Sequence, residues 1–256
     1  APVVNVYGSG TSAVQLYSYN PFKAGATTMY APVVMNDYYD YNSALVIQNL
    51  GAVATNVTVV YTTSDGDKTQ SAEVAAGSAW SIYVPSQGPT GSGNTLPSGD
   101  ANGLFSAVVT STGVGAGDAQ EIAVLVNESN NYNRAASFVG FAAGSDEVRA
   151  PVVLKRYYNY NSSMTCQVIS GGPATMTIEY FDATGSLGTT TSASTADGGT
   201  ALFYQPGSPD LPNDWVGSAV VTSAAQIACV INQDMNEGEY QTTDWDQLLA
   251  YEGVSP

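Results

Sequence analysis

The residues that could carry chemistry in this chain are mainly carboxylates, because histidine is absent. Among 256 residues, 22 are Asp or Glu, six are Lys or Arg, and none is His. This composition excludes Ser–His nucleophile pairs, His-ligated zinc and the most common general base. No Gly-rich phosphate loop follows an expected strand. Most carboxylates lie in turn-like clusters, so the sequence predicts no catalytic residue, no cofactor and no enzyme; a hydrolase pair of Asp and Glu is the alternative.

Two acidic segments have the oxygen-rich composition of calcium loops. They are Ser64-Asp65-Gly66-Asp67 and Asp244-Trp245-Asp246, and carboxylate oxygens are the ligands that calcium prefers. Neither fits a loop signature, and Asp-Gly is an ordinary hairpin turn. The sequence therefore predicts no metal site, with a bound calcium ion as the alternative.

The balance of charge limits the possible partners. The formal net charge is −16, which predicts repulsion from nucleic acid and from anionic membrane surfaces. No run approaches the roughly 18 apolar residues of a membrane-spanning helix. We therefore expect neither a nucleic-acid partner nor a membrane span.

Two tyrosine clusters and three Asn triplets point to carbohydrate. Tyr38-Tyr39-Asp40-Tyr41 and Tyr157-Tyr158-Asn159-Tyr160 offer rings that can stack on sugars, as in an adhesin that binds surface glycans. Both clusters lie at expected junctions between domains, where packing is the simpler explanation. Triplets that permit glycosylation begin at Asn56, Asn127 and Asn161.

The elements that position these residues come from a tandem duplication. The motif of Ala31–Ser43 returns at Ala150–Ser162, and 13 of the 36 positions aligned from Ala31 and Ala150 are identical. Ser106–Ser111 recurs unchanged at Ser218–Ser223. Such a repeat fixes the architecture. We expect an N-terminal segment at 1–30, a first module at 31–149 and a second module at 150–256.

Each module reads as a series of short strands. Runs of β-branched and aromatic residues alternate with Gly, Asn, Asp and Ser clusters, while helical periodicity is nearly absent. About seven such runs in roughly 110 residues are typical of an immunoglobulin-like sandwich. The predicted fold class is all-β, with two tandem immunoglobulin-like β-sandwiches and an extra N-terminal strand segment. The expected strands are Ala44–Asn49, Asn56–Thr62, Gln70–Val74, Ala79–Val84, Phe105–Ser111, Glu121–Asn127 and Ala135–Phe141, then Met164–Ile169, Thr175–Phe181, a Thr/Ser/Ala-rich stretch, Ala201–Gln205, Ser218–Ser223, Gln226–Asn232 and Gln247–Tyr251.

The two cysteines of the chain, Cys166 and Cys229, both lie in the second module. Their counterparts in the first module are Ile47 and Val124, which are apolar. Because a sandwich places facing residues of its two sheets at such positions, we predict a disulfide between the two sheets. Two buried free thiols are the alternative.

The motifs also resemble tandem modules in secreted and surface proteins of environmental filamentous bacteria. The segments that carry the resemblance are Pro32–Asn42, Val57–Tyr61, Leu211-Pro212, Gly217–Ser223 and Tyr17–Phe22. The resemblance covers nearly the whole chain and implies a β-sandwich in an extracellular setting. It supplies no catalytic residues.

A closing strand occurs three times, although there are only two modules to receive it. Ala136–Phe141 is matched by Tyr17–Phe22 and, more loosely, by Leu249–Val254. If each copy belongs to the module before it, the N-terminal copy has no host; if each belongs to the module after it, the C-terminal copy has none. An unpaired strand needs a sheet edge, and another subunit can supply one.

These observations predict a donor strand and a polymer. The donor residues are Ser12, Val14, Leu16, Tyr17, Tyr19 and Phe22, with Val14 and Leu16 alternating with Gln15. A head-to-tail contact that does not close builds a filament. We predict the structural subunit of an extracellular filament or fibril, secreted or on the cell surface, whose partner is itself. The alternatives are an extra edge strand on the first module, and a carbohydrate-binding adhesin-type module of a larger secreted protein.

Overall fold

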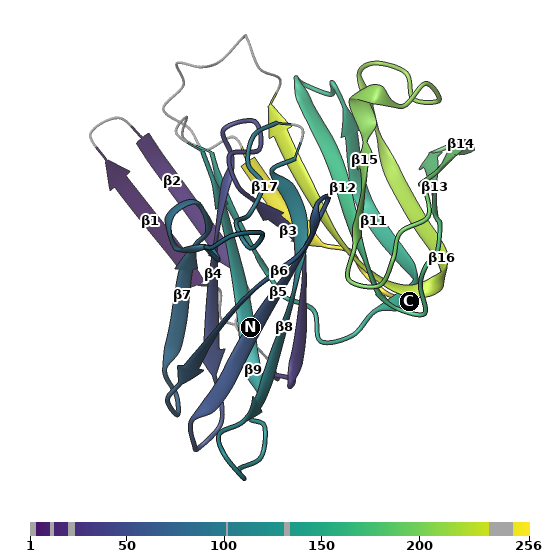
Figure 1. Cartoon of the computed structure of the whole chain (residues 1–256). Helices are drawn as coiled ribbons and strands as arrows, with labels where there is room; N and C mark the ends of the chain where they lie inside the picture. The colour runs from purple at the N-terminus through teal and green to yellow at the C-terminus, as the bar shows by residue number, and fades with distance from the viewer. Residues whose placement is uncertain (1–3, 11–12, 20–23, 101, 131–133, 236–247) are drawn as a thin grey trace.

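The regular secondary structure of the described residues is almost entirely antiparallel β-structure, with two groups of strands lying side by side (Figure 1). The computed structural model describes residues 4–10, 13–19, 24–100, 102–130, 134–235 and 248–256. The helical elements within these ranges are the single turn α1 at Val84–Gln87 and a 3₁₀ turn at Gln205–Gly207. No helix in the described ranges has the length and apolar character that a membrane crossing requires.

The strands follow one another along the chain, most of them through short connections. In order they are β1 Val4–Gly10, β2 Ala13–Tyr19, β3 Thr28–Met35, β4 Asn42–Asn49, β5 Thr55–Thr63, β6 Gly66–Val74, β7 Ala79–Tyr83, β8 Leu104–Gly113, β9 Ile122–Ser129, β10 Ala135–Val139, β11 Ser145–Lys155, β12 Tyr160–Ser170, β13 Met176–Asp182, β14 Gly185–Thr191, β15 Thr200–Tyr204, β16 Trp215–Met235 and β17 Leu248–Glu252. We call β3–β10 the first repeat and β11–β17 the second repeat.

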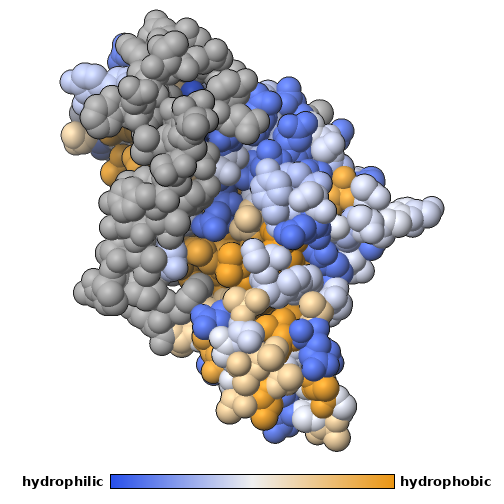
Figure 2. All heavy atoms as spheres, turned by 90° about the vertical axis from the view of Figure 1, so that its left-hand side faces the viewer, coloured by the Kyte–Doolittle hydropathy of each residue, from blue (hydrophilic) through white to orange (hydrophobic). Residues whose placement is uncertain are grey.

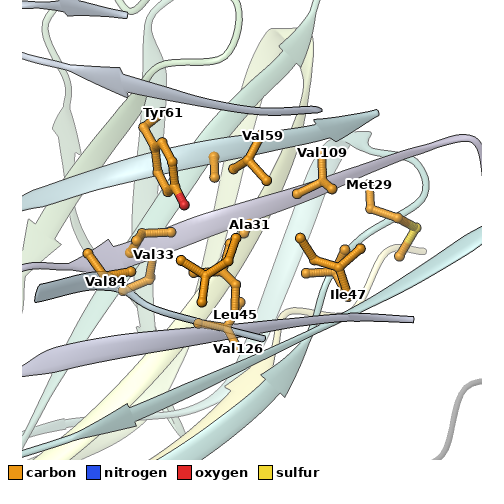
Figure 3. Close-up of a cluster of buried hydrophobic side chains, with 14 of the residues drawn as sticks. Met29, Ala31, Val33, Leu45, Ile47, Val59, Tyr61, Val84, Val109 and Val126 are labelled. Carbon is orange, nitrogen blue, oxygen red and sulfur yellow. The ribbon is translucent and has the colours of Figure 1, made fainter. Parts of the chain in front are cut away.

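The first repeat consists of two four-stranded sheets around a shared core. Their strand orders are β10-β9-β4-β7 and β3-β8-β5-β6. Buried and half-exposed residues alternate along β4 and β5, as expected for strands with one face toward a core. Side chains from both sheets meet there, including Leu45, Val59 and the fully buried Tyr61 (Figure 3). The structure is thus all-β and sandwich-like.

The second repeat follows the same plan with one continuous strand in place of two. The first part of β16 pairs with β11 and β13, and its later part pairs with β12 and β17. The expectation of separate strands at Ser218–Ser223 and Gln226–Asn232 is therefore wrong. The first repeat connects β8 to β9 through the turn-rich residues 114–121, whereas the second repeat crosses the same place without leaving the extended conformation.

The Ala-Pro-Val-Val motif lies inside strands that the sequence did not predict. β3 and β11 begin at Thr28 and Ser145, upstream of the expected module boundaries at 31 and 150. Residues Ala31–Met35 are all buried, so the strand shows no alternation. The register shifts at the motif in both repeats, and a bulge of this kind accommodates proline in a strand.

The tyrosine motif is a turn with the same geometry in both repeats. Tyr38 and Tyr41 exchange backbone hydrogen bonds, as do Tyr157 and Tyr160. The two residues between them have φ values of 48° and 66° in each copy, the left-handed values of a type I′ turn. The Asn and Ser that follow fix the preceding strand through side-chain oxygens, which accept from Asp37 N and Met35 N in the first copy and from Arg156 N and Leu154 N in the second.

A disulfide joins Cys166 to Cys229, with an Sγ–Sγ distance of 2.10 Å. The two residues are direct cross-strand partners on β12 and β16, so the bridge lies within one sheet. The prediction of a bridge between two sheets is wrong, because these two strands are antiparallel neighbours and their side chains share the inward face. Ile47 and Val124 face each other in the same way in the first repeat.

Candidate assembly interface

Three β-hairpins in the chain have the same pairing register. In the first repeat β9 pairs with β10 so that Asn127 lies opposite Ser137. In the second repeat Asn232 lies opposite Ala250 on β17. At the N-terminus β1 pairs with β2, and Asn5 lies opposite Ser18. The closing strand therefore recurs as a whole hairpin whose first strand carries the same Asn.

The strand pairing shows to which module each closing strand belongs. β9 also pairs with β4, and β16 also pairs with β12, so both of these hairpins belong to the strands before them. Within the described residues, β1 and β2 form a two-stranded sheet of their own. The N-terminal hairpin is thus the surplus copy, as the first of the two sequence alternatives states.

The predicted donor residues fall on this hairpin. Val14, Leu16, Tyr17 and Tyr19 lie on β2, which pairs with β1 and does not pair with either sheet of the first repeat. The expectation of a lone or extra edge strand is therefore wrong, because residues upstream of the motif supply the partner. Ser12 and Phe22 lie outside the described residues.

The hairpin packs on the first repeat as the first repeat packs on the second. β2 lies against β10, and β10 lies against β17. A sheet of the second repeat turns its outer face to the first repeat, so that Val230 and Leu248 enter the first core. This sheet is consequently buried on both faces, whereas an antiparallel sheet commonly has one face exposed to solvent.

Polar contacts fix the junction between the two repeats. The Gln167 side chain is fully buried and donates through Nε2 to Gly198 O at 2.9 Å and to Ala107 O at 3.2 Å. Ser106 on the first repeat donates to the same Gly198 carbonyl. Glu252 accepts a hydrogen bond from Val139 N at 2.8 Å. Because most of these groups are buried, each bond also removes a desolvation penalty.

A partly buried ion pair lies at one end of the junction. Arg134 Nη1 is 3.0 Å from Asp234 Oδ2, and the Arg134 side chain is almost completely enclosed. The Tyr41 hydroxyl donates to the same carboxylate at 2.5 Å. Burial, together with the neighbouring Asp234 carboxylate, raises the pKa of Tyr41 above its usual range. The tyrosine remains neutral and the three side chains tie the first repeat to the end of β16.

Glu128 is a fully buried carboxyl at the same junction. Its Oε2 accepts a hydrogen bond from Asn232 Nδ2 at 2.8 Å, while its Oε1 has no partner among the described residues. Burial raises the pKa of the Glu128 carboxyl to about 8, and the bond from Asn232 opposes this shift. Burial at the junction thus favours the protonated, neutral carboxyl over the carboxylate.

A pocket of about 490 Å³ opens between the repeats. The first tyrosine cluster lines it, which places Tyr38, Tyr39 and Tyr41 at the junction, opposite Leu202 and Tyr204. Polar residues also line it, namely Asn161, Ser163, Thr165, Asn232 and Asp234. The second tyrosine cluster does not line this pocket, and its Tyr158 is 79% exposed.

The remaining predicted sites have ordinary structural surroundings. Asp65 pairs with Lys68 at the β5–β6 turn, and residues 244–246 lie outside the described residues. No group of three or more metal-ligating side chains occurs in the described part of the chain. Asn56 and Asn127 are half-exposed on strands, whereas Asn161 is buried with its Oδ1 bonded to Arg156 N.

Sequence reasoning missed the buried polar groups at the junction. Asp234 lies by sequence in one of the turn-like clusters of carboxylates, but in the structure it is the penultimate residue of β16. A signal was present at Glu128, because it continues the inward alternation of Ile122, Val124 and Val126, where an apolar residue is expected.

No family model, no curated protein and no solved structure matches the chain.

Proposed function

We propose that the chain is the structural subunit of an extracellular filament, built from two immunoglobulin-like sandwiches that assemble head to tail by strand donation. The observation that carries the proposal is the surplus hairpin. Its register equals that of β16 and β17, so β2 can take the place of β17 on β16 of another copy without a shift. When one end of each subunit donates a strand and the other end accepts one, and the contact does not close into a ring, subunits add one after another into a filament.

The strand lengths favour the exchange. β2 spans seven residues, whereas β17 spans five. In the matched register Leu16 takes the position of Leu248, which packs into the core of the first repeat. Donation therefore buries apolar side chains and completes a ladder of backbone hydrogen bonds together. The disulfide and the resemblance to secreted modules support an extracellular setting.

Deletion of residues 1–23 tests donation. We expect the shortened chain to remain folded, because both repeats keep their own closing strands, and to sediment as a monomer at concentrations at which the whole chain polymerises. A peptide of residues 12–22 should bind the whole chain and shorten its polymers. Filaments of undiminished length from the deleted chain, seen by electron microscopy, would rule out donation by this hairpin.

A pair of substitutions supplies the matched control. Val14→Asp with Leu16→Asp should abolish polymerisation, because the apolar positions of the donor alternate at these residues. Gln15→Asp adds charge to the same strand at the intervening position and should leave polymers intact. Equal effects of both changes would assign the loss to charge alone.

The pocket between the repeats favours a second candidate function, the binding of a neutral sugar. Tyr39 and Tyr204 line it and are about half exposed, and their rings can stack on a pyranose, while the half-exposed Ser163 and Asn232, which also line the pocket, can bond its hydroxyls. Tyr204→Ala should then weaken binding of a neutral oligosaccharide at least tenfold in calorimetric titration. Tyr158→Ala, in the cluster outside the pocket, should have no effect; equal affinities for both variants contradict the proposal.

A further inference from the structure

The second repeat covers one side of the first repeat. The equivalent side of the second repeat itself is exposed to solvent. In the first repeat Val33 is 2% exposed and Ala136 is 4% exposed, because the second repeat packs there. The matching residues of the second repeat are Val152, exposed to 43%, and Leu249, exposed to 57%. Val216, which matches Leu104, is also exposed. We call Val152, Val216 and Leu249 the lateral patch.

The covering surface is duplicated as well. The junction uses Gln167 and Gly198 of the second repeat, and both are buried. The same pair occurs in the first repeat as Gln48 and Gly77, where Gln48 Nε2 lies 3.5 Å from Gly77 O. Both glycines have positive φ, 66° and 80°. Here, however, Gln48 is half-exposed and Gly77 is exposed.

The acceptor side of the contact is repeated too. Gln167 bonds to the carbonyl of Ala107, next to Ser106, in the strand Ser106–Ser111 that is identical at Ser218–Ser223. Ser106 is fully buried against the second repeat, whereas Ser218 is half-exposed. One such contact is made within the chain, and two halves of it are unused. The first is Gln48, half-exposed, with Gly77, exposed; the second is the half-exposed Ser218, which precedes Ala219, whose side chain is buried in the second core.

We propose that these two unused halves bind each other between copies of the chain. The lateral patch of one copy would receive the outer face of the first repeat of a second copy, formed by Val46, Gln48 and Gly77, with the geometry of the junction inside the chain. This inference rests on the proposed head-to-tail assembly and names its surfaces. The occupant is a second copy, because the only face on the described chain that carries the Gln–Gly pair in an uncovered state is the first repeat's own.

The N-terminal hairpin fits this arrangement. It lies against β10 on the side of the molecule where the outer face of β4 and β7 also lies (Figure 1). On that side hydrophobic residues reach the surface beside the residues drawn in grey (Figure 2). When the second repeat of another copy docks there, its β16 comes to the position of β1, because the two hairpins have one register. Surface docking and strand donation then form a single joint.

Two variants that block opposite ends test the inference. The patch variant, Val152→Arg with Val216→Arg, should fail to polymerise because charges replace the apolar contact. The face variant, Val46→Arg with Gln48→Arg, should fail as well. An equimolar mixture should form dimers and nothing larger, because each variant retains the half that the other lacks. Analytical ultracentrifugation measures all three states.

Matched controls separate a specific effect from added charge. Val53→Arg and Val114→Arg place the same side chain at exposed apolar positions in loops of the first repeat, and both should leave polymerisation within twofold of the unchanged chain. Circular dichroism establishes that each variant is folded. Polymers from either blocked variant, or a mixture that remains monomeric although both variants are folded, would overturn the proposal.

The outcomes also separate this inference from the proposed donation. If the blocked variants polymerise but the chain lacking residues 1–23 does not, donation stands and the surfaces named here are wrong. If the chain lacking residues 1–23 polymerises and the blocked variants do not, the surfaces stand and donation fails. Monomers of the unchanged chain at every concentration overturn both.

Discussion

At the scale of single residues, Glu128 connects the folded state of this protein to pH. Its carboxyl is fully buried between the repeats, and burial raises its pKa from 4.5 to about 8. An acid whose pKa is higher in the folded chain than in the unfolded chain stabilises the fold fully below the unfolded pKa. That stabilisation declines as the pH rises from about 4.5 and is lost by about pH 8.

Glu128→Gln should remove this pH dependence. The second repeat has Gln233 at the matching position, where its Nε2 donates to Val152 O at 3.1 Å, so a neutral amide suits the site. Between pH 5 and 8, we expect the free energy of unfolding of the variant to rise relative to that of the unchanged chain. The difference between the two should change by up to about 1.4 kcal/mol per pH unit. Urea unfolding at a series of pH values measures the difference.

An exposed carboxylate on the same segment provides the comparison. Glu121 is exposed just before β9, so Glu121→Gln should leave the pH profile parallel to that of the unchanged chain. If Glu128→Gln also gives a parallel profile, Glu128 is ionised in the folded protein and its burial is compensated by contacts other than the Asn232 bond.

Sequence reasoning identified residues better than their partners. The apolar identity of Ile47 and Val124 placed the two cysteines in matching positions, and they are cross-strand neighbours. The sheet in which they meet was not predicted, because alternation along a strand defines which face a residue occupies and does not define which strand lies beside it. For the same reason the sequence did not connect Glu128 to Asn232, which lie 104 residues apart.

At the scale of elements, the disulfide replaces an apolar contact with a covalent one. Cys166 and Cys229 occupy in the second repeat the place of the Ile47–Val124 pair in the first, and they enclose a sequence separation of 63 residues. A crosslink over such a loop lowers the entropy of the unfolded chain and is worth about 4 kcal/mol.

Cys166→Ile with Cys229→Val transfers the first repeat's pair into the second. We expect this variant to fold with a free energy of unfolding about 4 kcal/mol below that of the oxidised chain, because the packing is kept and the crosslink is lost. Cys166→Ser with Cys229→Ser should lose more, since two hydroxyls are then buried in an apolar core. Equal stability of the Ile/Val variant and the oxidised chain in urea would show that the crosslink contributes nothing.

Strand prediction succeeded for the alternating strands β4 and β5 and failed for β3. β4 and β5 alternate and were predicted within one or two residues. β3 is buried along Ala31–Met35 and contains a proline, so neither alternation nor propensity identified it. A break in β16 was expected by analogy with the loop between β8 and β9 in the first repeat. No local sequence rule indicates that the second repeat has no such loop.

At the scale of the whole molecule, the two repeats occupy different surroundings although they share sequence motifs and strand pairing. Gln48 and Gln167 are the same residue in the same strand position, yet the first is half-exposed and the second is fully buried. Ser106 and Ser218 show the reverse order. The sequence predicted the duplication and the surplus closing strand. It did not predict which copy is covered, because that depends on the packing of one repeat against the other.

The disulfide also determines how much of the chain can bear mechanical load. Tension applied at the two ends passes from Cys166 to Cys229 through the bridge and bypasses the residues between them. With a separation of 63 residues, roughly 200–230 Å of contour length stays out of the load path at 3.3–3.6 Å per residue. β13, β14, β15 and the first part of β16 lie within that sheltered loop. With the disulfide intact, a filament would therefore extend mainly through the first repeat of each subunit. After reduction, the residues between Cys166 and Cys229 could unfold and extend as well.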